Sequence, residues 1–279
     1  MTSRFLYAVF FSLILAGNFT SCKRTKQQED ALYSRHLQRQ VKLTVIHTPV
    51  PGDKSEINLI VFNDGQELEK LNVKNIIDSL YKAEKIEPVV VVGIYAGNRL
   101  QEFGVSEKKA ADGAGEKAGY YDSFINNELY PFAKKSAGVR KFKSVTIVGL
   151  GAGGLSALDI AWEHSDKISK AGIFSGAFSR KEKNATADTS AAGIMCNKLQ
   201  SSRKRPKTQF WFYAGEKGNA GITGDDAADI AASTNAITTL LENKNFTAAG
   251  DVVYVKGASN DMTAWKTVLP EFFQWAVGK

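Results

Sequence analysis

The chain has 279 residues, of which 43% are hydrophobic and 10% aromatic, and a formal net charge of +7. This composition excludes a disordered chain, and the length suffices for one domain with a sizeable core. The chain has only two cysteines, Cys22 and Cys196, which excludes a disulfide framework as the source of its stability. The positive charge favours anionic partners. We interpret its densest run, Arg203–Lys207, as a solvated loop before a strand and expect no nucleic-acid partner.

The N-terminal residues predict export rather than folded structure. A short basic start, Met1–Arg4, precedes the apolar run Phe5–Gly17, which is too short to span a bilayer comfortably. Cys22 and a polar stretch follow, and residues 1–22 together resemble a bacterial lipoprotein signal. The resemblance implies lipidation of Cys22 and a membrane anchor in the bacterial envelope, in the periplasm or on the outer membrane. The alternative is ordinary signal cleavage with Cys22 left free. We expect a polar tether over residues 23–39.

Strand-like and helix-like segments then alternate over residues 40–279. The expected strands are Val41–Thr48, Ile57–Phe62, Pro88–Ile94, Ser144–Val148, Ala171–Ser175, Thr208–Ala214 and Asp251–Val255. The expected helices are Val73–Ala83, Tyr120–Ser136, Leu155–His164, Asp225–Asn243 and Ala264–Val277. This alternation predicts a single α/β domain with a mostly parallel central sheet and helices on both faces. In such a fold, ligands bind at the carboxyl ends of the strands.

Residues 145–154, Val-Thr-Ile-Val-Gly-Leu-Gly-Ala-Gly-Gly, form a strand that runs into a glycine-rich turn. Gly149, Gly151 and Gly154 satisfy the dinucleotide fingerprint G-x-G-x-x-G. The same turn fits the hydrolase elbow G-x-S-x-G, with Gly149 and Gly153 as the outer glycines and Gly151 in place of the serine. A dinucleotide site needs an acidic residue at the end of the next strand, and that strand has none. We therefore favour the elbow and expect no cofactor.

Several segments beyond the elbow resemble, in the same order, a family of esterases that includes esterase D and enterochelin esterase. The resemblance runs from about Val41 to the C-terminus and implies an α/β-hydrolase fold with carboxylic-ester hydrolase chemistry. The segments that carry it are Asn63–Gln66, Pro88–Ile94, Asn98–Gly104, Phe124–Phe132, Gly149–Leu155, Lys170–Phe178, Phe212–Lys217, Ala264–Trp265 and Leu269–Phe273.

The family's chemistry requires a nucleophile, a histidine that takes its proton, and an acid that orients the histidine. The resemblance puts Gly151 at the nucleophile position and Ser259 at the histidine position, and it leaves Glu216 as a possible acid. The chain order in this fold is nucleophile, acid, histidine, yet no histidine follows His164. Both reactive side chains are therefore missing.

Backbone groups can persist where side chains are lost. The N–H groups of Ala152 and of Asp64 or Gly65 would form the oxyanion-type niche that the family uses. No spacing of Cys, His and carboxylates predicts a metal site. The sequence favours a catalytically degenerate, membrane-tethered esterase-family protein that binds a small molecule, a glycan or a protein in its crevice. The alternative is an active ester hydrolase, for example of carbohydrate or siderophore esters, built around Glu216, Ser259 and Asp261.

Overall fold

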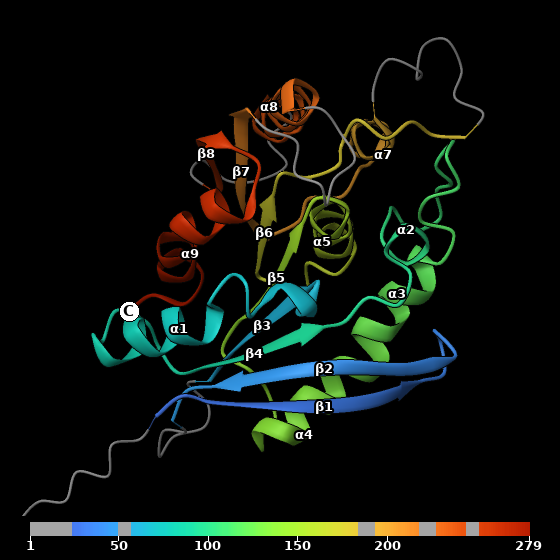
Figure 1. Ribbon diagram of the computed structural model, residues 1–279. Helices are drawn as coiled ribbons and strands as arrows, with labels where there is room; N and C mark the ends of the chain where they lie inside the picture. The colour runs from blue at the N-terminus through green and yellow to red at the C-terminus, as the bar shows by residue number, and fades with distance from the viewer. Residues whose placement is uncertain (1–23, 50–56, 184–192, 218–226, 244–250) are drawn as a thin grey trace, which may run out of the picture.

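The computed structural model describes residues 24–49, 57–183, 193–217, 227–243 and 251–279. Its strands form one sheet with helices on both faces (Figure 1). The strands are β1 (Lys26–Ser34), β2 (Arg39–His47), β3 (Asn58–Asn63), β4 (Val89–Ile94), β5 (Val145–Leu150), β6 (Lys170–Phe174), β7 (Gln209–Lys217) and β8 (Val252–Ser259). The helices are η2 (Gly65–Glu67), α1 (Val73–Lys82), α2 (Arg99–Glu102), α3 (Ala118–Phe124), η3 (Ile125–Leu129), α4 (Tyr130–Ala137), α5 (Ala152–Glu163), α7 (Ile194–Ser201), α8 (Ala227–Asn243) and α9 (Met262–Val277).

The sheet order is β1-β2-β4-β3-β5-β6-β7-β8. Strands β3 to β8 pair in parallel, whereas β2 pairs antiparallel with both β1 and β4. The strands β3, β4 and β5 are buried along their whole length, as strands covered on both faces should be. The predicted α/β fold with a mostly parallel sheet is confirmed.

The polar segment at the start of the described chain is a strand and not a tether. Strand β1 pairs with β2 over all nine of its residues, so the tether predicted for residues 23–39 does not exist beyond Thr25. The polarity that suggested a tether has another cause. An edge strand is exposed and commonly carries charged residues. Only some of the side chains of β1, such as that of Leu32, pack against the core.

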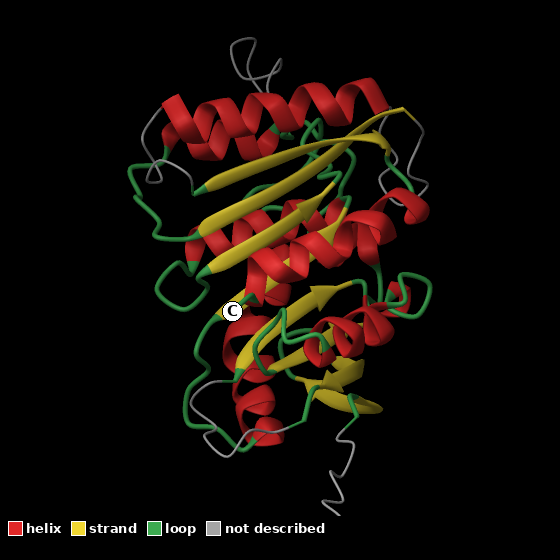
Figure 2. Cartoon of the chain, turned by 90° about the vertical axis from the view of Figure 1, so that its left-hand side faces the viewer, coloured by secondary structure: helices red, strands yellow, loops and turns green. Residues whose placement is uncertain are grey.

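Helices lie on both faces of the sheet (Figure 2), and an apolar layer lies beneath the helices of each face. One layer lies under α1 and α9 and contains the ring cluster Phe174, Trp211, Phe272 and Trp275. The other lies under α3, α4, α5, α7 and α8. Within the described ranges, no helix is both long and apolar enough to cross a bilayer.

Two helical segments differ from the sequence prediction. The expected helix Tyr120–Ser136 is present, but it consists of three consecutive segments: α3, the π-helical turn η3 and α4. Helix α7 is not among the helices that we expected, and Lys198 fixes it in place by donating to the buried Asp159 of α5 at 2.5 Å. Burial raises the pKa of Asp159, and the Lys198 ammonium counteracts that rise. Only the tertiary contact reveals this helix, because its sequence has little amphipathic pattern.

Candidate functional site

The elbow lies at the carboxyl edge of the sheet, where β5 ends at Leu150 and α5 begins at Ala152. Gly151 joins them with φ 55° and ψ −117°, a conformation that strains any residue with a side chain. Its N–H donates to the carbonyl of Phe174 at 2.8 Å, and its own carbonyl accepts from the N–H of Ala177 at 3.1 Å. The elbow backbone is thus fixed to the end of β6 although it carries no reactive group.

Close packing explains the glycines around Gly151. A Cβ atom on Gly149 would lie 2.0 Å from the carbonyl oxygen of Gly153, so β5 and the first turn of α5 touch backbone to backbone. A Cβ atom on Gly154 would lie 3.1 Å from the carbonyl oxygen of Gly149. This contact also lets α5 begin three residues before the predicted Leu155. The fingerprint letters therefore reflect strand–helix packing and need no bound dinucleotide.

A buried ion pair lies beside the elbow. Asp64, directly after β3, is fully buried and has a φ of 64°. Arg99 donates to both of its carboxylate oxygens, from Nε at 2.5 Å and from Nη2 at 2.9 Å. Burial raises the pKa of Asp64, and the hydrogen bonds and charge of Arg99 counteract that rise. Its Oδ2 lies 2.8 Å from the point where a Cβ of Gly153 would sit, so the pair borders the elbow directly.

A second contact joins the end of β3 to the elbow. The Asn63 amide donates to the carbonyl of Gly153 at 2.9 Å, and the Tyr121 hydroxyl donates to Asn63 Oδ1 at 2.7 Å. The oxyanion-type backbone positions therefore share one edge. Ala152 is the first residue of α5, where an N–H has no acceptor within the helix, and Asp64 and Gly65 follow β3. The sequence indicated these positions but not the Asp64–Arg99 pair.

The turn from β8 to α9 holds Ser259, the residue at the predicted histidine position. Ser259 ends β8, and its hydroxyl donates to Asp261 Oδ2 at 2.7 Å. Asp261 caps α9 through its other oxygen, which accepts from the N–H of Ala264 at 2.9 Å. This backbone bond and the Ser259 hydroxyl lower the pKa of Asp261, which makes it a weak base.

The next residue, Asn260, is completely buried and joins three strand ends. Its Oδ1 accepts from the Ser175 hydroxyl and from the N–H of Gly215, both at 2.7 Å. Its Nδ2 donates to the Gly215 carbonyl at 2.8 Å, and the Trp265 indole donates to Ser175 Oγ at 3.0 Å. Ser175 lies between the two residues that hold Gly151, so this network connects the elbow with the β8–α9 turn. Sequence reasoning missed Asn260 and Ser175.

Glu216, the predicted acid, lies apart from Ser259. It is exposed near the end of β7 and borders an open cavity of about 330 Å³ with Tyr254 and Lys256, next to α8. Burial, and then the Glu216 carboxylate, raises the pKa of Tyr254. Alternation along the paired strands puts Glu216 on the α8 side and Ser259 on the α9 side.

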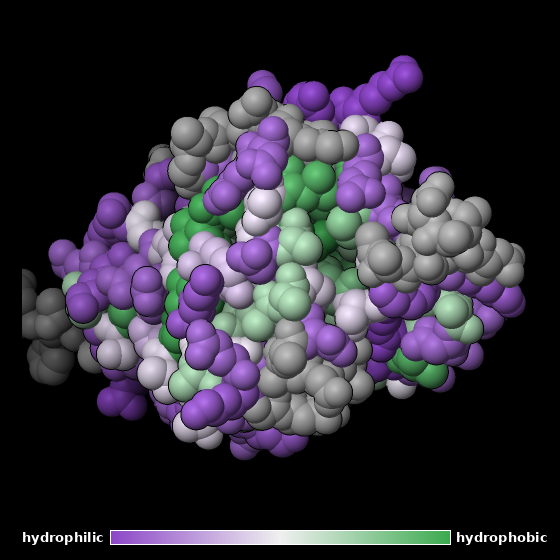
Figure 3. All heavy atoms as spheres, turned by 90° about the horizontal axis from the view of Figure 1, so that it is seen from above, coloured by the Kyte–Doolittle hydropathy of each residue, from purple (hydrophilic) through white to green (hydrophobic). Residues whose placement is uncertain are grey.

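Figure 3 shows the molecule from above. Hydrophobic side chains gather in the middle of this face of the molecule, and hydrophilic ones border them.

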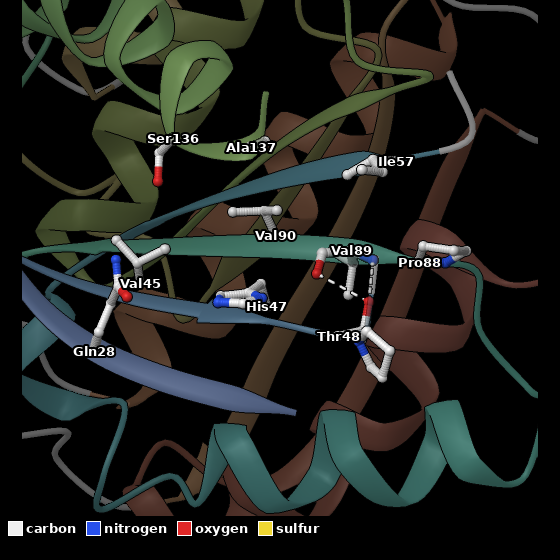
Figure 4. A pocket seen from close by; sticks show the side chains of 11 residues that line it. Gln28, Val45, His47, Thr48, Ile57, Pro88, Val89, Val90, Ser136 and Ala137 are labelled. Atoms are coloured by element: carbon white, nitrogen blue, oxygen red, sulfur yellow. Dashed lines mark hydrogen bonds between the residues drawn. The ribbon is translucent and has the colours of Figure 1, made fainter. Parts of the chain in front are cut away.

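None of the three histidines lies at the elbow. His164 caps the far end of α5 and pairs with Asp122 at 2.8 Å. His36 lies in the turn between β1 and β2. Strand β2 is three strands away from β5 in the sheet, which separates these two strands by roughly 15 Å at about 4.8 Å per strand. His47 lines a cavity of about 140 Å³ between β2, β4 and α4, near the opposite edge of the sheet (Figure 4).

Other polar and aromatic candidates near the elbow are structural. The Ser156 hydroxyl accepts from the N–H of Gly104 at 2.9 Å and donates back to its carbonyl. Four aromatic side chains on the helices and loops of this edge, Phe103, Tyr121, Phe178 and Trp265, are buried in the core, whereas Tyr120 is exposed. Over the described parts of the chain, no group of three or more Cys, His, Asp and Glu side chains could hold a metal ion.

Comparison with known proteins places this geometry in a family. A family model described as "Putative esterase" matches residues 34–276. An enterobactin esterase structure from Shigella flexneri superposes with a TM-score of 0.70 at 17% identity, over 92% of this chain and 61% of its own. A ferulic acid esterase gives 0.68 at 15% identity, over 91% and 98%. The BES protein from Bacillus cereus gives 0.66 at 14% identity, over 99% of both chains.

No curated protein matches the chain by sequence. The chain spans about three fifths of the enterobactin esterase that it resembles, and at these identities the structures share only the fold. The family model, by contrast, covers most of the chain, and it agrees with the predicted resemblance. The chain therefore belongs to the esterase family and has its α/β-hydrolase fold.

Proposed function

We propose that this protein is a catalytically degenerate member of the esterase family, anchored to a bacterial membrane through a lipid on Cys22, and that it acts by binding. The observation that carries the proposal is the elbow itself. Gly151 holds the conformation of a nucleophile-bearing residue and has no side chain, while all three histidines lie away from the elbow. Losing both groups leaves only binding and oxyanion contacts for catalysis.

The elbow edge retains what binding needs. The elbow, the Asp64–Arg99 pair and the Asn260 network are all fixed by hydrogen bonds, so the edge has a defined shape. The side chains of its ion pair neutralise each other, which disfavours a simple anion and favours a neutral or mixed ligand. A glycan, a siderophore-like compound or a protein partner fits this chemistry. Cys22 lies outside the described residues, and the proposed anchor rests on the signal-like sequence alone.

The competing function is an active ester hydrolase that uses Glu216, Ser259 and Asp261. The hydrogen bond from the Ser259 hydroxyl to the Asp261 carboxylate is the observation in its favour. Two features weigh against it: the pKa of Asp261 is lowered, and Glu216 faces α8.

Activity tests separate the two functions. The wild-type protein should hydrolyse short-chain aryl esters and acetylated xylan no faster than a Gly151→Ala variant, and a fluorophosphonate probe should not label it. Turnover that is well above this control and is lost in Ser259→Ala would establish the hydrolase instead. Thermal-shift screening with glycans and siderophores then searches for the ligand, since a ligand at 100 times its Kd stabilises by about 2.7 kcal/mol.

The anchor has a separate test. Metabolic labelling with a radioactive fatty acid should mark the full chain and the Cys196→Ser variant but not Cys22→Ser. Labelling that persists in Cys22→Ser would refute the anchor and leave the proposed binding role of the crevice untouched.

A further inference from the structure

The positive charge of the chain gathers at the edge of the sheet opposite to the elbow. This edge comprises the loops that precede the parallel strands and the C-terminal ends of the helices. We define its exposed basic residues as the basic edge: Arg24, Lys26, Lys82, Lys85, Lys135, Arg140, Lys141, Lys143, Lys167, Arg203, Lys204, Arg205, Lys207 and Lys279. The acidic residues at the same edge are fewer, namely Asp78, Glu84, Glu87, Glu163, Asp166, Glu242 and Asp251.

Backbone hydrogen bonds show that these loops are neighbours. Lys143, before β5, donates to the carbonyl of Ile57 before β3 at 2.9 Å, and Ser169, before β6, donates to that of Val145 at 2.9 Å. Gln209 in turn donates to the Ser169 carbonyl at 2.9 Å. The C-terminus joins the same edge, because Lys279 donates to the Lys85 carbonyl at 3.4 Å. The side of the molecule that carries the C-terminus faces the reader in Figure 2.

The elbow edge has a smaller excess. Its basic residues include Arg35, Arg39, Lys70, Lys74, Arg99, Lys108, Lys109, Lys117, Arg180, Lys181, Lys183, Lys217 and Lys256, and its acidic residues include Asp64, Glu67, Glu69, Glu102, Glu107, Asp112, Glu116, Glu182, Glu216, Asp229 and Asp261. The two signs nearly balance there. Ion pairs form at both edges, as between Arg99 and Asp64 beside the elbow and between Lys143 and Glu87 at the basic edge.

Helix dipoles account for only part of the basic edge. Basic residues are favourable in the last turn of a helix, and Lys82 and Lys135 lie in such turns of α1 and α4. Arg140 and Lys141, before β5, and the run Arg203–Lys207, before β7, lie outside any helix. Lys204 pairs with Glu163 of α5. Arg140, Lys141 and Lys207 are exposed, so their charges are available to an external anionic partner.

The start of the described chain lies at the same edge. The N–H of Thr25 donates to Asp78 of α1 at 3.2 Å, and Lys26 opens β1 opposite His47, which pairs with Val90 near the start of β4. Few residues therefore separate Cys22 from the basic edge. A lipid on Cys22 would hold this edge within reach of the headgroups, and one acyl chain needs a basic patch or a second chain for stable anchoring.

We propose that the basic edge lies against the anionic lipid surface that carries the anchor, so that the elbow faces away from the membrane. The orientation rests on the proposed anchor at Cys22, whereas the affinity for anionic lipid does not. Strand β5 has six residues and spans about 20 Å from this edge to the elbow. The elbow is thereby held clear of the headgroups and open to a partner in the aqueous phase.

Vesicle binding by a chain that lacks Cys22 tests the affinity of the basic edge for lipid without the lipid anchor. Residues 24–279 keep every described strand and helix, and thermal unfolding verifies that this chain is folded. It should bind vesicles of phosphatidylcholine mixed with phosphatidylglycerol at about 0.1 M NaCl and release them at about 1 M, where the Debye length falls from about 10 Å to about 3 Å. It should not bind vesicles of phosphatidylcholine alone.

Two variants of equal charge make the test specific. Lys85→Gln, Lys135→Gln, Arg140→Gln and Lys141→Gln together remove four charges from the basic edge, and all four residues are exposed. Lys74→Gln, Lys109→Gln, Lys117→Gln and Lys217→Gln together remove four exposed charges from the elbow edge. Each basic residue close to an anionic membrane contributes to the free energy of binding. We therefore expect the first variant to bind the vesicles at least tenfold more weakly than wild type, and the second less than threefold more weakly.

Three results would overturn the proposal. Equal losses in both variants would mean that only net charge matters, and absence of wild-type binding would mean that the edge does not dock on lipid. Displacement from vesicles by single-stranded nucleic acid at equal charge concentration would assign the edge to nucleic acid. The vesicle assay uses a chain without the anchor, so a negative result there says nothing against lipidation of Cys22. Likewise, absence of fatty-acid labelling at Cys22 would not affect the vesicle result.

Discussion

The two turns that would carry the family's reactive side chains are held in different ways. The elbow at Gly151 is held by backbone contacts: glycine against glycine between β5 and α5, and two hydrogen bonds to the end of β6. The turn at Ser259–Asp261 is held by side chains, above all by the buried amide of Asn260. A backbone-held turn can lose its reactive side chain without losing its shape. A side-chain-held turn depends on the particular residues present.

The largest effect should come from the backbone contact. In Gly149→Ala, the new methyl group meets the Gly153 carbonyl, which cannot move without displacing α5. We expect a loss of about 3 kcal/mol in the free energy of unfolding, at the upper end for overpacking, measured by urea denaturation. Gly119→Ala is the matched control, because a methyl group there meets nothing within 4 Å. A Gly149→Ala variant as stable as the control would refute the backbone-held elbow.

The Asn260 network should give the next largest effect. Asn260→Ala leaves the N–H and the carbonyl of Gly215 and the Ser175 hydroxyl without their buried partner. Because each unsatisfied buried group is costly, we expect a loss of about 2–3 kcal/mol and a change in Trp265 fluorescence, since its indole donates to Ser175. The exposed Asn235→Ala on α8 should change stability by less than about 0.5 kcal/mol. If both variants unfold alike, the side-chain-held turn is not a distinct feature.

A side chain at the elbow should have a smaller cost. Gly151→Ser and Gly151→Ala both put a Cβ atom on a residue with φ 55°, which we expect to lower stability by about 1–2 kcal/mol. Neither variant should hydrolyse aryl esters, because no histidine lies within reach of the new hydroxyl. Ester turnover by Gly151→Ser alone would contradict our assignment of the three histidines. Adding Ser259→His then asks whether the two turns face each other, since only facing turns can restore turnover.

The smallest effect concerns the cap of α9. Asp261→Ala should lower stability by about 1 kcal/mol at neutral pH, because the N–H of Ala264 loses its acceptor. The pKa of Asp261 is lower in the folded chain than its ordinary value of 3.8. Its charge therefore stabilises the fold above pH 3.8, and this contribution disappears as the pH falls through the lower folded pKa. Asp261→Asn retains an acceptor but cannot titrate, so the stability difference from wild type should vary with pH only below about pH 4.

Local pattern was enough to predict the architecture. The alternation of apolar runs and helical spacing predicted the strands β2 to β8 and most helices, because these elements bury a periodic face. It failed where burial does not follow local pattern. Strand β1 is polar because it is an edge strand, and α7 is fixed by the long-range ion pairs of Lys198 with Asp159 and Glu163.

The sequence by itself determined that residue 151 is a glycine and that no histidine follows residue 164, because these are facts of covalent structure. Only the tertiary structure decided what holds those positions. Asp64 and Arg99, 35 residues apart, meet beside the elbow, and Asn260 meets Ser175 across 85 residues. Such contacts depend on which strand ends the sheet order places together. The same topology gathers dispersed basic loops at one edge, which a linear sequence cannot reveal.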